Sequence, residues 1–289
     1  MSLVYFIAIP LIASFFTPLY KNYLTYMSVL VNFALLGIAL SLNSALPLVE
    51  YLAFDSPLSI SFIWDSSSAF FVRLFIFVML LFSIYNVHAK NCNAMFILTN
   101  LLLVGVLGLV LSGDIFNIYI FFEIASISAY ILTTLNKDKK AYSGAIRYMI
   151  IGFIASIFLL LAIMLMYLNI GSLNLSTIAQ SFSTMDEKVQ FLVLLSLFIG
   201  FGIKAEIFPL NFWVADIYQA SQSKVAALFS SILSKSYIFV FFHIAYILNI
   251  EVKYFTALVL IGIVSFVVAE ISALSSKETK RIFAYSTLG

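Results

Sequence analysis

Hydrophobic residues run through this chain in long blocks that short polar connections separate. A helix needs about 20 apolar residues to cross the hydrocarbon core of a bilayer, and nine blocks come close to that length. The predicted spans are residues 2–20, 24–46, 66–87, 93–112, 115–135, 145–168, 189–212, 225–249 and 254–275. A tenth helix is predicted to begin at Thr279. The pattern therefore predicts an all-α, polytopic membrane helix bundle.

Two connections are long enough to hold structure of their own. Residues 47–65 are polar and aromatic, and a short hairpin is predicted there. Residues 171–187 have the pattern of a short amphipathic segment at the membrane interface. The first apolar block has no basic region before it and no clear cleavage site, so we expect a retained helix instead of a signal peptide.

Composition supports a membrane protein and excludes several functions. The 289 residues are 63% hydrophobic and 10% charged, against roughly 45–50% and about 25% in soluble domains. The net charge of +2 is too small to indicate a nucleic-acid partner. The single cysteine, Cys92, excludes an internal disulfide and a multi-cysteine metal or iron–sulfur site. No cofactor or metal site is predicted, and no catalytic motif indicates covalent chemistry in this chain.

The basic residues predict an orientation. If the N-terminus lies outside, ten lysines and arginines fall in inside loops and two in outside loops, which is the bias expected of a cell-membrane protein. The inside group is Lys21, Lys90, Lys137, Lys139, Lys140, Arg147, Lys224, Lys277, Lys280 and Arg281, and the outside group is Lys188 and Lys253. Three basic residues remain within spans: Arg73, Lys204 and Lys235.

Lys204 is the most informative of these three. It lies in VQFLVLLSLFIGFGIKAEIFPLNFW, where glycines precede it and Pro209 follows it. Proline removes the hydrogen bond to the carbonyl four residues back, which is that of Ala205, so the helix should be broken beside the lysine. Broken helices inside bilayers line cavities, and transporters place ion sites at them.

Glu123 is a candidate partner for Lys204. It lies deep in the span GDIFNIYIFFEIASISAYIL, with Ser126 and Ser128 nearby. Intramembrane acids commonly mark ion paths, and a carboxylate whose distance from a lysine changes would load and release a proton from it. The alternative is a structural ion pair. Glu206, two residues from Lys204, points to a different helix face and is either a second partner or a solvated group near the break.

Lys235 lies in a polar stripe of the eighth span. The flanking serines are Ser230, Ser231, Ser234 and Ser236. Such a stripe could line a hydrated lateral route from Lys204, with His243 two turns further as a relay group that titrates near neutral pH. A packing role for His243 is equally consistent with the sequence. We expect Arg73 to extend toward solvent and Glu270 to lie at the interface. Gly105 and Gly108 are predicted to allow close helix packing.

Four segments resemble a known family. SGDIFNIYIFFEIASISAYIL, GIKAEIFPLNFWVADIY, KVAALFSSILSKSYIF and KETKRIFAYSTLG, in this order, are similar to the proton-translocating antiporter-like proteins. These are the Mrp-type sodium/proton antiporter subunits, the D-type above all, and their relatives in respiratory complex I and membrane-bound hydrogenases. The resemblance runs from about residue 60 to the end, and it implies that the chain covers roughly the N-terminal 60% of a family member.

The resemblance assigns roles to residues already selected. Glu123 matches the glutamate of the fifth helix, Lys204 the lysine of the broken seventh helix, and Lys235 the lysine of the eighth helix that passes protons laterally. The motif KxxxxPxxxWxxD is matched by Pro209, Trp213 and Asp216, and the motif KRxxAYS by Lys280, Arg281 and Tyr285. His243 matches no family position, and the segment QASQSKVAAL lacks the proline that is usual before the eighth helix.

Family members have about fourteen helices in two inverted five-helix repeats, each with a broken helix and its own half-channel. The resemblance thus divides this chain into three leading helices (1–90), a first repeat (91–250) and the start of an incomplete second repeat (251–289). A single half-channel implies that another chain, or a further part of this one, supplies the other half.

Two functions of different kinds follow from this resemblance. The first is an ion-translocating subunit of a multisubunit antiporter or respiratory complex, with protons, and sodium as an alternative, as the coupled ions. The second is a structural membrane subunit of a hydrogenase or complex I-like assembly that moves no ions. A subunit of a redox-driven pump, whose chemistry takes place on other chains, would use the same residues as the first.

Overall fold

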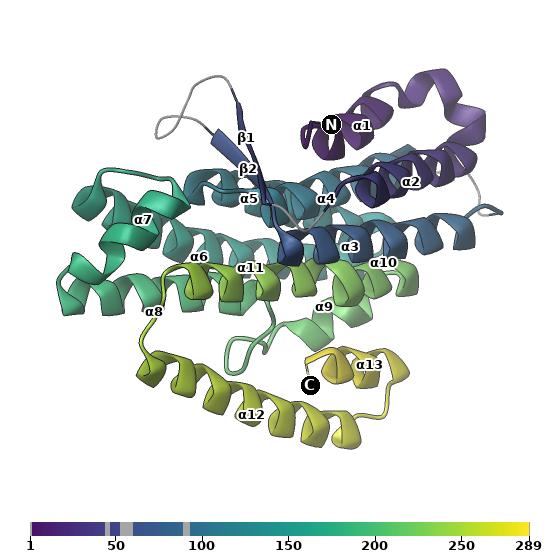
Figure 1. Cartoon of the computed structure of the whole chain (residues 1–289). Coiled ribbons are helices and arrows are strands. Elements are labelled where there is room, and N and C mark those ends of the chain that lie inside the picture. The colour runs from purple at the N-terminus through teal and green to yellow at the C-terminus, as the bar shows by residue number, and fades with distance from the viewer. Residues whose placement is uncertain (1, 44–46, 53–59, 89–92, 289) are drawn as a thin grey trace. The chain divides into compact units, whose positions relative to one another are not determined.

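The long apolar blocks of the sequence form helices in the computed structural model of the chain (Figure 1). The structure describes residues 2–43, 47–52, 60–88 and 93–288; Cys92 lies outside them. The chain divides into two compact units, Met1–Leu132 and Thr133–Gly289, and each unit is described by itself. The division by sequence repeats remains a prediction.

The first unit is a helical bundle with one small sheet. Its elements are α1 (Tyr5–Phe15), η1 (Thr17–Tyr23), α2 (Leu24–Ser41), β1 (Leu48–Leu52), β2 (Ile60–Trp64), α3 (Ser66–Tyr85), α4 (Asn93–Leu111) and α5 (Ile115–Thr133). Helix α4 is the centre of the unit, because 83% of its most apolar stretch is buried against 28% in α2. A Cβ at Gly105 would overlap the backbone of Ala125 in α5, which confirms the predicted packing role.

The predicted hairpin is present. Strands β1 and β2 are antiparallel, with Leu48 opposite Trp64 and Leu52 opposite Ile60. The Trp64 side chain is fully buried, and its ring stacks on Phe6 with the centroids 5.5 Å apart. The hairpin therefore covers the first helix with an aromatic residue.

Arg73 binds the end of a neighbouring helix. Its Nε donates to the carbonyl of Ala39 at 3.0 Å and its Nη2 to that of Leu42 at 2.7 Å. The guanidinium also lies 5.6 Å from the ring centroid of Trp64. Arg73 therefore caps the C-terminal end of α2, where carbonyl groups have no partner within the helix.

The second unit holds the remaining helices. They are η2 (Thr134–Asn136), α6 (Lys139–Ile170), α7 (Leu175–Ser181), η3 (Phe182–Thr184), α8 (Glu187–Lys204), α9 (Val214–Ala220), α10 (Ser223–Leu228), the π-helical segment η4 (Phe229–Leu233), α11 (Ser234–Ile247), α12 (Val252–Ser275) and α13 (Thr279–Leu288). Helix α6 packs along α8, and α13 lies against both α9 and α12 (Figure 1). The predicted interfacial segment forms α7, and the predicted tenth helix begins at Thr279.

Seven helical stretches among the described residues are long and apolar enough to cross a membrane. They are Leu24–Ser41, Ser66–Tyr85, Asn93–Leu111, Ile115–Asn136, Lys139–Ile170, Ser223–Ile247 and Val252–Ser275. Two of the nine predicted spans differ from this description. The first forms only the 11-residue α1, which ends shortly before Pro18 and the 3-10 turns of η1. The seventh forms α8, whose 18 residues include the charged Glu187, Lys188 and Lys204.

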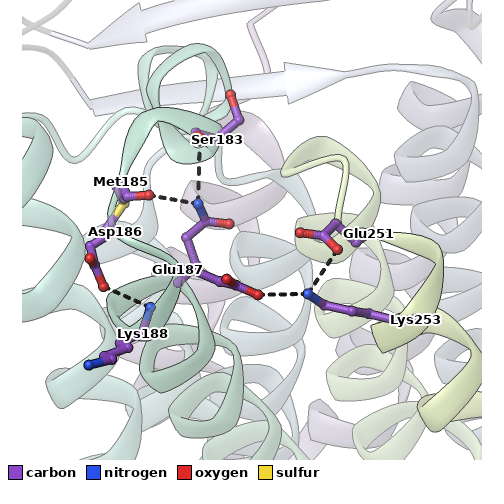
Figure 2. Close-up of polar contacts among 8 residues, drawn as sticks. Ser183, Met185, Asp186, Glu187, Lys188, Glu251 and Lys253 are labelled. Carbon is purple, nitrogen blue, oxygen red and sulfur yellow. Dashed lines mark hydrogen bonds and ion pairs between the residues drawn. The ribbon is translucent and has the colours of Figure 1, made fainter.

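The loops of the second unit form two groups, and the loops within each group contact one another. At one end Lys253 Nζ lies 2.9 Å from Glu187 Oε1 and 3.0 Å from Glu251 Oε2 (Figure 2). In another group Asn136 donates to the Ala220 carbonyl at 2.8 Å, and Lys280 donates to the Ser221 carbonyl at 2.9 Å. Loops predicted on the same side thus contact one another. Which side faces the cytoplasm remains a prediction.

Candidate functional site

The predicted helix break is present after Lys204. Helix α8 ends there, and α9 begins only at Val214. The amide of Ile207 donates to the carbonyl of Gly202 at 3.0 Å, which is the six-residue bond of a Schellman helix end. The residue that such an end holds in the left-handed conformation is usually glycine. Here it is Glu206, with φ 64°.

Two glycines and a cross-helix bond hold the broken segment in place. A Cβ at Gly200 would lie 3.1 Å from the Ala155 carbonyl oxygen, so glycine allows α8 to approach α6 closely. Gly202 leaves room for the side chain of Leu210, which folds back from the break. The amide of Phe208 donates to Ser265 Oγ in α12 at 3.1 Å. One backbone group freed by the break is therefore satisfied by protein, as a membrane interior requires.

Lys204 is buried against aromatic rings. Its side chain is 1% exposed, and its Nζ lies 4.8 Å from the ring centroid of Tyr148 in α6. The Tyr148 ring in turn stacks on Trp213, with 4.7 Å between centroids. The face of an aromatic ring attracts a cation. The ring stack thus stabilises an ammonium that would otherwise be costly to bury.

Glu206 is the acid that the structure brings to the break. It is 5% exposed, and its Oε1 accepts a hydrogen bond of 2.9 Å from the Tyr218 hydroxyl of α9. Its buried Oε2 accepts no hydrogen bond from any residue that the structure describes. The charge of Lys235 acts on the Glu206 carboxylate as a further stabilising interaction. Sequence reasoning left Glu206 undecided, and the structure gives it a specific partner.

Lys235 lies at the start of α11, directly after the π-helical segment. Its Nζ donates to the Thr287 carbonyl near the end of α13, at 3.1 Å. The flanking serine hydroxyls donate to carbonyls of their own helix, so they present lone pairs rather than hydrogens to any water beside them. His243, two turns further, stacks on Phe239 with 5.3 Å between centroids. Its relay role remains a prediction.

A cavity of about 560 Å³ with several hydroxyl-bearing residues in its lining lies between α13 and the helices α9 and α10. Tyr218 and Thr287 both line it, and each is hydrogen-bonded to one charged group: Tyr218 to Glu206, and Thr287 to Lys235. The remaining lining residues are Ser223, Ala226, Ala227, Ser230, Thr279, Lys280, Phe283 and Ser286. One residue that contacts the acid and one that contacts the lysine therefore line the same cavity.

Glu123 belongs to the first unit, on α5, and is half-buried. Its charge acts on Tyr119 and Tyr130 of the same helix, and the nearby Ser128 hydroxyl donates to the Ile124 carbonyl at 2.8 Å. Because Lys204 belongs to the second unit, the pairing of Glu123 with Lys204 remains a prediction. Glu270 is exposed on α12.

Two tyrosines of the site were missed by sequence reasoning. Tyr148 and Tyr218 are uncharged and belong to a chain with 16 tyrosines, so neither is distinguished by type or spacing. Asp216 is a candidate site residue only because it matches the family motif KxxxxPxxxWxxD. The structure shows it paired with Arg147 Nη1 at 3.7 Å and with Arg281 Nη2 at 3.4 Å, which links α6, α9 and α13.

Comparison with known proteins places the chain among membrane subunits. Residues 112–289 match the family model described as NADH:quinone oxidoreductase/Mrp antiporter, TM. A relative named "Putative antiporter subunit mnhD2" from Staphylococcus saprophyticus is 28% identical over 249 residues, which cover 83% of this chain and 49% of the relative. NADH-quinone oxidoreductase subunit N from Desulforudis audaxviator is 36% identical over 143 residues, 49% of this chain and 28% of that protein. The chain spans at most about half the length of these curated relatives.

Three solved structures share the fold. A chain of the membrane-bound sulfane sulfur reductase, an archaeal respiratory membrane complex, is 30% identical with a TM-score of 0.88; the match covers 100% of this chain and 63% of that one. A chain of the Mrp complex from Dietzia sp. DQ12-45-1b has a TM-score of 0.90 at 22% identity, over 99% and 56% of the two chains. A chain of respiratory complex I from Thermus thermophilus has a TM-score of 0.80 at 23% identity, over 100% and 62%. All three come from multisubunit membrane complexes.

Proposed function

Because the chain belongs to the membrane-subunit family of NADH:quinone oxidoreductases and Mrp antiporters, we propose that it translocates protons, alone or in exchange for sodium, within a multisubunit membrane complex. The observation that carries the proposal is Lys204, 1% exposed at the end of a broken helix. An ionisable group buried at a helix interruption is the arrangement with which transporters bind ions.

The proposed mechanism uses three charged residues. Glu123 and Lys204 form a pair whose separation changes during the cycle, and the lysine holds its proton more tightly when the carboxylate is near. When the pair separates, Lys204 releases its proton into a hydrated route toward Lys235, which passes it on. Water reaches Lys204 through the break between α8 and α9. Between transfers the face of the Tyr148 ring stabilises the buried ammonium of Lys204.

The chain has a defined orientation in the membrane and works with other subunits. We place the chain in the cell membrane with its N-terminus outside, as the bias of loop lysines and arginines predicts. Other membrane subunits are its partners, as in the complexes from which the solved relatives come. A second half-channel, from another chain or from a further part of this one, completes the path across the membrane.

Replacement of Lys204 tests this function. In cells that lack their own antiporters and express the full complex, Lys204→Ala should abolish ion exchange, measured as pH change in everted vesicles. Lys188→Ala is the matched control, because that lysine is exposed on the same helix. Undiminished exchange by an assembled Lys204→Ala complex would refute the assignment and favour a structural protein that moves no ions.

Replacement of Glu123 tests the pairing. Glu123→Gln keeps the size of the side chain and removes its charge, so exchange should fall while assembly is maintained. A wild-type exchange rate would show that the acid is structural and that Lys204 works without it.

A further inference from the structure

Glu206 is a buried acid that the proposed relay of Glu123, Lys204 and Lys235 does not use. Its backbone has the left-handed conformation, with φ 64°, for which glycine is the favoured residue at a helix end. A glutamate at this position works against the local backbone preference. The backbone conformation therefore does not explain why this position holds a glutamate, which leaves its carboxyl group as the feature with a role.

The two oxygens of the Glu206 carboxyl have different surroundings. Oε1 accepts the hydrogen bond from the Tyr218 hydroxyl, and Oε2 is buried with no hydrogen-bond partner among the described residues. A buried carboxylate normally needs donors to both oxygens, whereas a protonated carboxyl carries a hydrogen on one of them. The geometry suits a carboxyl with its proton on Oε2 and its other oxygen bonded to Tyr218.

The cavity beside α9 is large enough to hold water next to the partner of this acid. It begins at Tyr218, which contacts Glu206, and reaches Thr287, whose carbonyl holds Lys235. At about 560 Å³ the cavity has room for several waters, since one water occupies about 30 Å³ of liquid. Hydroxyl-bearing residues of its lining, Ser223, Ser230 and Ser286 among them, can bind such waters.

We propose that Glu206 is a proton-carrying residue that exchanges its proton with Lys235 through the Tyr218 hydroxyl and water in this cavity. The inference rests on the proposed function, to which it adds a carrier beside the broken helix. In the transfer the protonated oxygen turns toward Tyr218, its O–H bond breaks, and a new O–H bond forms on the tyrosine oxygen. Tyr218 gives its own hydroxyl hydrogen to water, and the water chain protonates the neutral amine of Lys235. One carboxylic acid becomes a carboxylate and one amine becomes an ammonium.

Two titratable groups act on Glu206 from other helices. They are Tyr218 on α9, whose hydroxyl donates to the carboxyl, and Lys235 on α11, whose charge acts on it. Burial favours the protonated acid, and the ammonium of Lys235 favours the carboxylate. The proton occupancy of Glu206 therefore changes whenever Lys235 gains or loses its charge, which couples the two sites.

Infrared difference spectroscopy of the purified full complex in lipid, titrated with pH in H₂O and in D₂O, tests the carrier directly. A protonated carboxyl gives a C=O band that shifts on deuteration. We expect Glu206→Gln to remove one such band, and the matched control Glu270→Gln, at an exposed acid on α12, to leave it unchanged. A band of wild-type intensity in Glu206→Gln would overturn the proposal.

Transport and two further variants complete the test. Glu206→Gln should lower exchange several-fold and flatten its pH dependence, while Glu206→Asp keeps a carboxyl and should keep the band. If Glu206→Gln does not assemble, Tyr218→Phe decides instead: the loss of the hydrogen bond should raise the frequency of the band, and an unmoved band would overturn the proposal. Lys204→Ala separates the two proposals, because exchange by that variant refutes the proposed function, whereas the Glu206 band tests only the carrier.

Discussion

The Tyr218 hydroxyl donates a 2.9 Å hydrogen bond to Oε1 of Glu206. Glu206 lies in the interruption just after the end of α8 and Tyr218 lies on α9, so the change in chain direction between the two helices creates their contact. In an unbroken helix Tyr218 would lie more than three turns beyond Glu206, too far away for the two side chains to touch. The break therefore builds a buried hydrogen-bonded pair of polar side chains close to Lys204.

Tyr218→Phe should reduce both stability and transport. The substitution leaves the carboxyl of Glu206 without its donor, and an unsatisfied buried polar group costs about 1–3 kcal/mol. We expect a lower thermal unfolding midpoint of the purified protein and slower ion exchange in vesicles. Tyr246→Phe is the control, since that tyrosine is 83% exposed. Equal midpoints for the two variants would show that the hydrogen bond contributes nothing to stability.

Tyr148→Leu should impair transport more than Tyr148→Phe. Leucine removes the ring below Lys204 Nζ, which lies 4.8 Å from its centroid, and the charged lysine loses about 0.5–2 kcal/mol of cation–π stabilisation. Phenylalanine keeps the aromatic face and the stacking on Trp213. Exchange rates measured in vesicles at matched protein levels distinguish the two. Equal rates would indicate that the tyrosine hydroxyl or simple packing, and not the ring face, is what the site needs.

Gly200→Leu should destabilise the second unit. Even a Cβ at this position would lie 3.1 Å from the Ala155 carbonyl oxygen and 3.2 Å from the Leu159 amide nitrogen, so a leucine forces α8 away from α6. Overpacking of this kind typically costs about 1–3 kcal/mol. The matched control is Gly262→Leu, because a Cβ at Gly262 on α12 meets nothing within 4 Å. A thermal melt of each variant makes the comparison, and equal melting of both would contradict the close packing.

Asp114 gives a prediction for the first unit. Its carboxylate accepts hydrogen bonds of 2.9 Å from the amides of Phe116 and Asn117 at the start of α5, so Asp114→Ala should cost about 1 kcal/mol of stability. Burial raises the pKa of Asp114, and the two amide hydrogen bonds partly oppose that shift. Asp114→Asn keeps an acceptor for the amides and buries no charge, so it should be at least as stable as the wild type at neutral pH.

The pH dependence of stability checks the same residue. Because the pKa of Asp114 is higher in the folded protein than in the unfolded chain, folding favours its protonated form. Its contribution to stability is therefore greatest below the unfolded pKa and falls as the pH rises through the folded pKa. Asp114→Asn lacks this titration, so the difference in melting temperature between variant and wild type should grow with pH. A constant difference from pH 4 to pH 8 would contradict the shift.

Much of the architecture follows from local features of the sequence. Apolar blocks of bilayer length predict helices because no other open structure satisfies its backbone in lipid, and Pro209 predicts the break after Lys204 because it removes a helix hydrogen bond. These features depend on neighbours within one or two turns, which the sequence displays directly.

The site itself depended on contacts between distant residues. Arg73 caps α2 because the end of that helix lies beside it in the fold, a contact that no local pattern predicts. Tyr148 and Tyr218 are ordinary aromatic residues in the sequence and become functional candidates only through their distances from Lys204 and Glu206. The sequence by itself determined which charges enter the membrane and where a helix must break. Only the tertiary structure decided which groups surround those charges, because helix packing and the path of the chain after the break set distances that no local pattern records.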